Sequence, residues 1–173
     1  ILIAGGLPPQ NDILYSDDGG QTWQTVFEGD TIDTGAIAKI AISPNFNEDG
    51  LAVAWLQNAG LLQSTDWGQN WRYFSDDLTI YATAQSLTFD PSGAWLYLGT
   101  LDGHLYFSDD GGQTWWFDMG ESIPEPRVWS SAIAFDETGT LYLGTDTGIF
   151  RTSNGGETWL DVSEGLPQRA PDN

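Results

Sequence analysis

The chain has 173 residues, enough for one domain with a sizeable core, and its nine Trp and 21 Gly suggest many short strands joined by tight turns. Acidic residues outnumber basic ones by 25 to 5, so the formal charge of −20 repels nucleic-acid phosphates and anionic membrane surfaces. Cysteine is absent, which excludes disulfides and thiol chemistry, and no apolar run reaches the ~18 residues of a membrane-spanning helix.

Four octapeptides repeat along the chain and align without gaps. They begin at Ser16, Ser64, Ser108 and Thr152, so successive starts are 48, 44 and 44 residues apart, and they share the pattern Ser/Thr-x-Asp/Asn-x-Gly-x-x-Trp. A period of ~40–50 residues matches a propeller blade of four short strands. The sequence therefore predicts an all-β fold, a β-propeller of four-stranded antiparallel blades, with about four blades visible as part of a larger propeller.

Apolar runs around the octapeptides predict the strands, because alternate positions of a strand face the same side. The segment after each octapeptide forms the last strand of its blade, which makes 15 predicted strands, three in the first blade and four in each of the others. In chain order, the runs before the octapeptides are 2–4, 13–15, 39–42, 51–54, 61–63, 86–89, 96–98, 105–107, 132–135, 141–143 and 149–151.

Each octapeptide is predicted to be the hairpin between the last two strands of a blade. Its Asp or Asn accepts backbone hydrogen bonds in the turn, its Gly adopts a conformation that is costly for other residues, and its Trp packs against the turn. A metal site is the alternative, but each octapeptide offers a single well-placed carboxylate, so no metal or cofactor is predicted. The residues given this structural role are Ser16, Asp18, Gly20, Trp23, Ser64, Asp66, Gly68, Trp71, Ser108, Asp110, Gly112, Trp115, Thr152, Asn154, Gly156 and Trp159.

The octapeptide resembles the Asp-box, or BNR, repeat of sialidases, xyloglucanases, sortilin-type receptors and the photosystem II assembly-factor family. The resemblance covers essentially the whole chain and implies a β-propeller. Because the repeat is common to all of these proteins, it implies none of their activities in particular.

The repeat also predicts the boundaries of the blades. The first blade lacks its opening strand, since Ile1 already aligns with the second strand of the other blades. Further blades of the same chain, or another subunit, are therefore expected to cover the open edges. The predicted blades are 1–35, 36–82, 83–127 and 128–166, and 167–173 is a tail or linker toward a further blade.

Catalytic residues of the related enzymes are not recognisable in the sequence. The sialidase family is expected to use three arginines that clamp a carboxylate, whereas the arginines here lie at unrelated positions of the repeat or in the tail. A glycosidase needs two carboxylates roughly 5–10 Å apart, and no pair stands out by motif. His104, the sole histidine, lies in a column expected to be exposed and variable. No catalytic residue is assigned.

Ligand binding is expected on the face formed by the connections between blades and by the loops between second and third strands. That face holds Trp55, Tyr81, Arg127 and Trp129, whose side chains could stack on sugars or seat a peptide. The alternative for the aromatic residues is that they pack against neighbouring blades.

These observations favour a non-catalytic binding or assembly scaffold outside the cytoplasm, either secreted, on the cell surface or periplasmic. Its ligand is a protein or a glycan, and nucleic acid is excluded by charge. The alternative hypothesis is a fragment of a sialidase-like or xyloglucanase-like glycoside hydrolase whose catalytic residues lie elsewhere. On the first hypothesis, the segment alone does not cleave sialosides or β-glucans.

Overall fold

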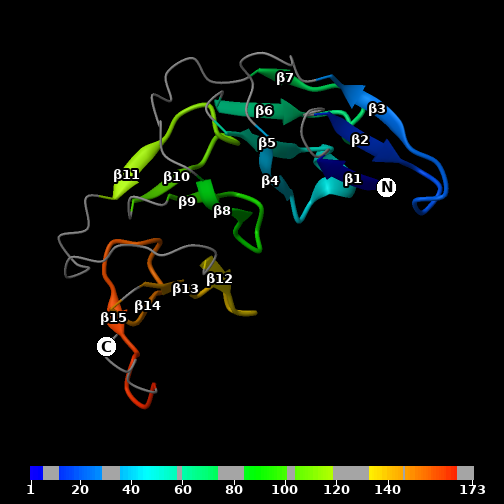
Figure 1. Ribbon diagram of the computed structural model, residues 1–173. Helices are drawn as coiled ribbons and strands as arrows, with labels where there is room; N and C mark the ends of the chain where they lie inside the picture. The colour runs from blue at the N-terminus through cyan, green and yellow to red at the C-terminus, as the bar shows by residue number, and fades with distance from the viewer. Residues whose placement is uncertain are drawn as a thin grey trace, which may run out of the picture.

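The computed structural model describes residues 1–5, 12–28, 36–57, 60–73, 84–100, 104–118, 133–145 and 147–166. They form 15 strands in four antiparallel sheets, three strands in the first and four in each of the others, as predicted (Figure 1). Blade 1 contains β1 (Leu2–Gly5), β2 (Ile13–Ser16) and β3 (Gln24–Phe27). Blade 2 contains β4 (Ile37–Ile42), β5 (Ala52–Leu56), β6 (Gly60–Ser64) and β7 (Arg72–Tyr73). Blade 3 contains β8 (Ala84–Phe89), β9 (Leu96–Thr100), β10 (Leu105–Ser108) and β11 (Trp116–Asp118). Blade 4 contains β12 (Ile133–Phe135), β13 (Leu141–Gly144), β14 (Ile149–Thr152) and β15 (Leu160–Asp161).

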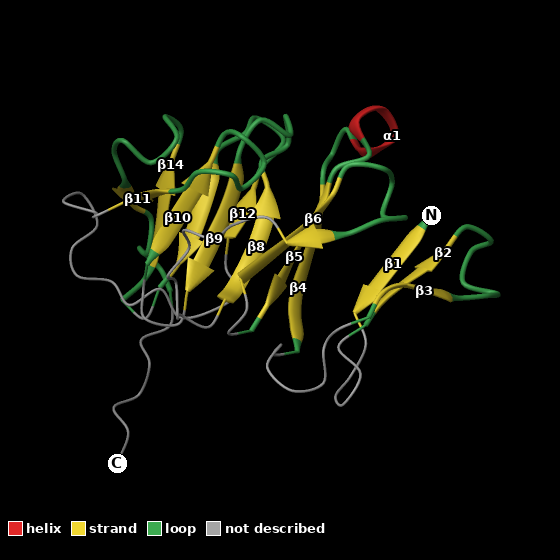
Figure 2. Ribbon diagram, turned by 90° about the horizontal axis from the view of Figure 1, so that it is seen from above, coloured by secondary structure: helices red, strands yellow, loops and turns green. Residues whose placement is uncertain are grey.

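Each blade is an antiparallel meander in which neighbours in sequence are neighbours in the sheet. The blades lie side by side in an arc, with β4, β8 and β12 toward its inner side and β7, β11 and β15 at its outer rim (Figures 1 and 2). In the described residues β1 pairs with β2 alone. The single helix among them, α1 (Phe46–Asp49), is one turn long and precedes β5. No helix in the described ranges is long and apolar enough to cross a membrane.

The core lies between the blades and not within any one of them. Because side chains alternate along a strand, the sheets of blades 2 and 3 each bury one face against the preceding blade and the other against the following one. One buried cluster joins blades 1 and 2 through Ile13 and Leu62, a second joins blades 2 and 3 through Val53 and Leu98, and a third joins blades 3 and 4 through Leu105 and Leu143. Each blade is therefore stabilised chiefly by its neighbours.

The hairpin before β7 also touches the preceding blade, and this contact can be tested at Gly68. Gly68→Ala is expected to lower the free energy of unfolding by about 1 kcal/mol more than Gly139→Ala. Both glycines have similar positive φ values, 84° and 82°, so an added side chain causes similar backbone strain at the two positions. An added Cβ would lie 2.5 Å from Cδ1 of Ile3 at position 68, whereas it meets nothing within 4 Å at position 139. Urea unfolding measures the free energy of unfolding of both variants. Equal losses of stability would show that this hairpin does not rest on blade 1.

Candidate functional site

The four octapeptides, which we call loops 1 to 4 in chain order, form the hairpins between the last two strands of each blade, as predicted. In loop 3, Oδ1 of Asp110 accepts the backbone N–H groups of Gln113 and Thr114 at 2.7 and 2.9 Å. Oδ2 accepts the Thr114 hydroxyl at 2.7 Å. The Ser108 hydroxyl donates to Oδ1 at 2.8 Å and accepts the N–H of Gly112 at 2.7 Å. The carboxylate and the hydroxyl together accept the backbone N–H groups of Gly112, Gln113 and Thr114 in the turn.

The same network recurs in the other loops with conservative changes. Asp18 accepts from Gln21, Thr22 and Ser16 in loop 1, and Asp66 accepts from Asn70 and Ser64 in loop 2. In loop 4 the neutral Asn154 replaces the aspartate; its Oδ1 accepts the N–H of Thr158 and its Nδ2 donates to the Thr158 hydroxyl. An amide thus maintains the turn without a charge.

Hydrogen bonding keeps the loop aspartates ionised. The backbone N–H and the hydroxyl of Thr22 lower the pKa of Asp18 from 3.8 to about 2. For Asp110, partial burial raises the pKa, but the hydrogen bonds from Thr114, Ser108 and Gln113 outweigh it and the net shift is downward. The balance of causes for Asp66 is the same. These carboxylates act as acceptors for their own turns, and within the described ranges no three His, Asp or Glu side chains are grouped to hold a metal ion.

Trp55 does not lie on a binding surface. It is the fourth of the five residues of β5, its side chain is 1 % exposed, and it packs in the cluster between blades 2 and 3. The sequence prediction ended this strand at Ala54, whereas it continues to Leu56 and places Trp55 on the same face as Val53. Of the two interpretations of this residue, packing against a neighbouring blade is correct. Tyr81, Arg127 and Trp129 lie outside the described residues.

His104 is half-buried, which corrects the expectation that its column is exposed. Its ring meets Tyr106 edge to face at 6.2 Å between centroids. Its backbone N–H donates to the Thr100 hydroxyl at 3.2 Å and its carbonyl accepts the Thr100 N–H at 3.0 Å. His104 therefore immediately precedes β10, and its backbone is hydrogen-bonded to Thr100 at the end of β9.

An aromatic cluster on blade 3 is formed by two exposed tryptophans, Trp95 and Trp116, and the half-buried Phe107. Trp95 immediately precedes β9, and Phe107 on β10 is directly opposite Trp116 on β11. The rings of Phe107 and Trp116 stack at 6.0 Å and 27°, and Trp95 lies 6.0 Å from the first ring and 6.1 Å from the second. Trp95 is 36 % exposed and Trp116 is 43 % exposed. Sequence reasoning missed this cluster, although Trp116 directly after the octapeptide Trp115 was a visible signal.

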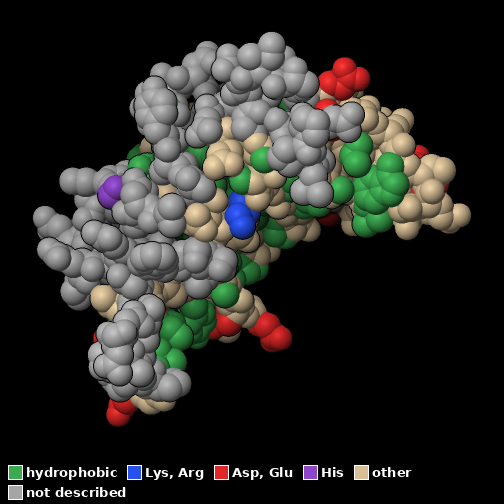
Figure 3. Space-filling model, in the orientation of Figure 1, with side chains coloured by type: hydrophobic (Ala, Val, Ile, Leu, Met, Phe, Trp, Pro, Cys, Tyr) green, Lys and Arg blue, Asp and Glu red, His purple; other side chains and the backbone are tan. Residues whose placement is uncertain are grey.

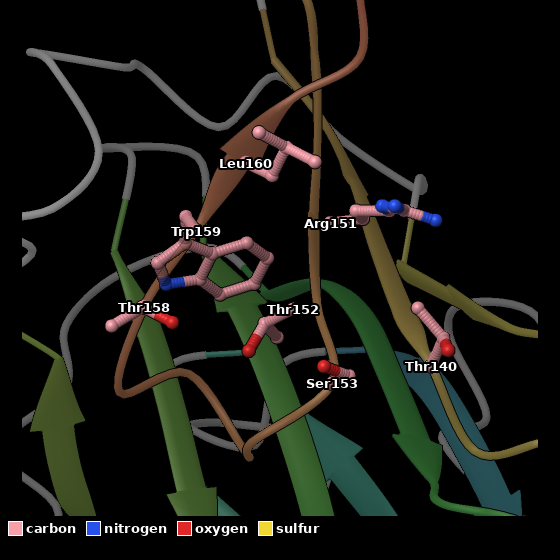
Figure 4. Close-up of a pocket in the computed structure, with 7 residues that line it drawn as sticks. All are labelled: Thr140, Arg151, Thr152, Ser153, Thr158, Trp159 and Leu160. Carbon is pink, nitrogen blue, oxygen red and sulfur yellow. The ribbon is translucent and has the colours of Figure 1, made fainter.

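Blade 4 carries a cavity of about 380 Å³ (Figure 4). Arg151 and Thr140 extend from adjacent strands on one side of it, and the ring of Trp159 lies on the other. Figure 3 shows one face of the molecule, on which the visible acidic side chains are scattered around the edge and form no single patch. The lining residues are Thr140, Arg151, Thr152, Ser153, Thr158, Trp159 and Leu160.

No family model matches the chain. Among curated proteins it is 27 % identical over 169 residues to a xyloglucanase of Hypocrea jecorina, and the match covers 96 % of this chain and 18 % of that enzyme. It is 31 % identical over 142 residues to a xyloglucanase of Acetivibrio thermocellus, covering 62 % of this chain and 17 % of that enzyme. The chain thus spans less than a fifth of the curated relatives it matches.

Solved structures of propeller proteins resemble the chain in fold. The structure of YCF48 bound to D1 peptide matches with a TM-score of 0.65 at 21 % identity, over 92 % of this chain and 49 % of that one. A GH74 enzyme of Niastella koreensis matches with a TM-score of 0.65 at 20 % identity, over 90 % of this chain and 26 % of that one. The fold is a β-propeller. At these identities the structural matches show the fold alone, and the partial coverage of both proteins fits a part of a larger propeller.

Proposed function

We propose that the chain is part of a non-catalytic binding and assembly scaffold that acts outside the cytoplasm and holds a segment of a partner protein on the aromatic cluster. The contact of the exposed Trp95 and Trp116 with each other and with the half-buried Phe107 is the observation that carries this proposal. Stacked aromatic rings on a rigid sheet supply a large contact area at low cost in conformational entropy, and Trp is enriched among residues that dominate binding energy.

The charge of the chain indicates which partner suits this surface. A formal charge of −20 attracts cationic segments and accelerates their association. Lys and Arg side chains also interact favourably with the faces of Trp rings. We therefore propose that the partner is a basic peptide segment. The same acidity supports a role for the chain in a salt-exposed or extracytoplasmic setting, where charge keeps a protein soluble.

The solved structures add independent support. YCF48, which this chain resembles over 92 % of its length, is described as bound to D1 peptide. A propeller of this kind can therefore hold a peptide. That support comes from fold likeness and is separate from the geometry of the aromatic cluster.

Peptide binding is expected to depend on the exposed tryptophans of blade 3. Basic peptides selected on the chain from a random library should lose at least about tenfold in affinity when Trp95 and Trp116 are both replaced by Ala. Trp67→Ala is the matched control, since Trp67 is 40 % exposed but lies in loop 2, outside the cluster. Calorimetric titration gives the Kd of each variant. Selected peptides that bind the double variant as tightly as the unaltered chain would contradict the proposal.

A second candidate function, a part of a glycoside hydrolase, is favoured by the sequence similarity to two xyloglucanases. Release of reducing ends from xyloglucan by the full-length protein is the decisive measurement. If the chain is part of a non-catalytic scaffold, the protein should release no reducing ends from xyloglucan. Reproducible turnover that one Asp or Glu substitution abolishes would establish the enzyme instead.

A further inference from the structure

Loop 4 differs from the other three loops in a way that changes its chemistry. Asn154 and Gly155 form the sole Asn-Gly step in the sequence, at the place where loops 1 and 3 have Asp-Gly and loop 2 has Asp-Trp. Asparagine is a thermally labile residue, and a glycine after it has no Cβ to hinder attack by its own backbone nitrogen on the side-chain amide. Loop 4 therefore combines a reactive amide with an unhindered neighbouring nitrogen.

The surroundings of this step are open to water. Asn154 and Gly155 are both exposed, and a Cβ added to Gly155 would meet nothing within 4 Å. No residue in the described part of the chain accepts a hydrogen bond from the Gly155 N–H. In loop 3, by contrast, a Cβ added to Gly111 would lie 3.3 Å from Nε2 of Gln63 on the preceding blade. Trp159 of loop 4 packs in the cluster between blades 3 and 4, yet blade 3 leaves Gly155 uncovered.

The amide of Asn154 is held mainly by hydrogen bonds at the surface. Its Oδ1 accepts the Thr152 hydroxyl at 2.7 Å and the N–H of Thr158 at 3.1 Å. Its Nδ2 donates to the Thr158 hydroxyl at 3.0 Å. Both hydrogen bonds with Thr158 are exposed to solvent, so water replaces them at low cost when the amide turns toward the nitrogen of Gly155.

The aspartates at the same position are protected by their charge. Hydrogen bonds from the backbone N–H and the hydroxyl of Thr22 lower the pKa of Asp18 to about 2. For Asp110, partial burial raises the pKa, but the hydrogen bonds led by that from Thr114 outweigh it. Both carboxylates are therefore ionised at neutral pH. An ionised carboxylate resists nucleophilic attack, whereas the amide carbon of Asn154 is neutral and can release ammonia.

We propose that Asn154 is a site of spontaneous deamidation. The backbone nitrogen of Gly155 forms a bond to Cγ of Asn154, and its proton passes through water to Nδ2. The bond from Cγ to Nδ2 then breaks, which releases ammonia and leaves a cyclic imide. Water opens the imide at one of its two carbonyl carbons. Cleavage at Cγ gives aspartate, and cleavage at the backbone carbonyl carbon gives isoaspartate, so in both cases water enters and ammonia leaves.

The two products affect loop 4 in opposite ways. Aspartate is the residue that the other three loops carry, and in loop 3 Asp110 accepts both the N–H and the hydroxyl of Thr114. Thr158 can offer the same two groups to an aspartate at position 154, so this product retains the turn. Isoaspartate routes the backbone through Cγ and moves the carboxylate, so the acceptor of the turn is lost. Deamidation thus adds a negative charge to blade 4 and, in the isoaspartate form, loosens its last hairpin.

Mass spectrometry of proteolytic peptides, after incubation of the folded protein in a mildly alkaline buffer, tests the proposal. The peptide containing Asn154 should gain about 1 Da as the amide is replaced by a carboxylate. Asn70 is the internal control, since it is exposed in loop 2 but precedes Trp71. Asn154 should react at least about tenfold faster than Asn70, and Gly155→Ala should slow it at least about tenfold. This variant should fold, because Trp67 occupies the same position in loop 2 with a φ of 63°.

The stability of the aged protein tests the effect on loop 4. Ion-exchange chromatography separates the products by their added charge, and enzymatic methylation identifies the isoaspartate fraction. That fraction should unfold at a lower urea concentration than both the fresh protein and Asn154→Asp, which reproduces the aspartate product. Deamidation of Asn154 no faster than that of Asn70, or a rate unchanged by Gly155→Ala, would overturn the proposal. An isoaspartate fraction as stable as the fresh protein would overturn the expected loosening of the hairpin.

Discussion

Replacement of Trp55 by alanine is expected to lower the free energy of unfolding by about 3–5 kcal/mol. The side chain is 1 % exposed and packs between blades 2 and 3, in a cluster that includes Leu61 and Leu98. Its loss removes a large apolar contact and leaves a cavity that the neighbouring strands can fill only in part. Because each blade is stabilised by its neighbours, the effect should spread to both blades. Urea unfolding followed by far-ultraviolet circular dichroism measures it.

Trp67→Ala serves as the control for this substitution. The Trp67 side chain is 40 % exposed, so its removal should cost less than about 1.5 kcal/mol. The comparison also separates the two roles considered for Trp55. A loss below that of Trp67→Ala, accompanied by loss of partner binding, would make Trp55 a ligand contact and contradict its assignment to the core.

Replacement of Asp110 by alanine is expected to cost about 1–2 kcal/mol, whereas replacement by asparagine should cost much less. Alanine leaves the backbone N–H groups of Gln113 and Thr114 without their acceptor. Asparagine retains an acceptor, and loop 4 shows how the amide fits, with Oδ1 of Asn154 accepting a backbone N–H and Nδ2 donating to a threonine hydroxyl. Equal losses for the two variants would show that the charge, and not the acceptor, holds the turn.

Acid should weaken the loops that carry aspartate. Folding lowers the pKa of Asp18 from 3.8 to about 2, and lowers those of Asp66 and Asp110 in the same direction. As the pH falls, the unfolded chain binds the proton first, so the stability these groups contribute is complete above about pH 4 and is lost as the pH falls toward 2. Asp110→Asn should therefore lose less stability over this range than the unaltered protein. Parallel losses in urea titrations at each pH would show that Asp110 does not contribute to the acid sensitivity.

The repeat made the strands predictable because its determinants are local. Each octapeptide supplies its own acceptor, glycine and tryptophan within eight residues, so its turn forms in the same way wherever it occurs. The alternating apolar runs on either side then specify which residues face the neighbouring blades. The four blades, the three strands of blade 1 and the hairpin position of the octapeptides all follow from these two patterns.

The surfaces, by contrast, depend on register and on the packing of blades, which bring distant residues together. Trp95 and Trp116 meet because β9, β10 and β11 pair in one particular register, and Trp55 is buried because β5 extends beyond Ala54 against blade 3. The sequence by itself determined the repeat, the strands and the turns, since these rest on contacts within a few residues. Only the tertiary structure decided which aromatic side chains are buried and which remain exposed, because burial is settled by the neighbouring blade.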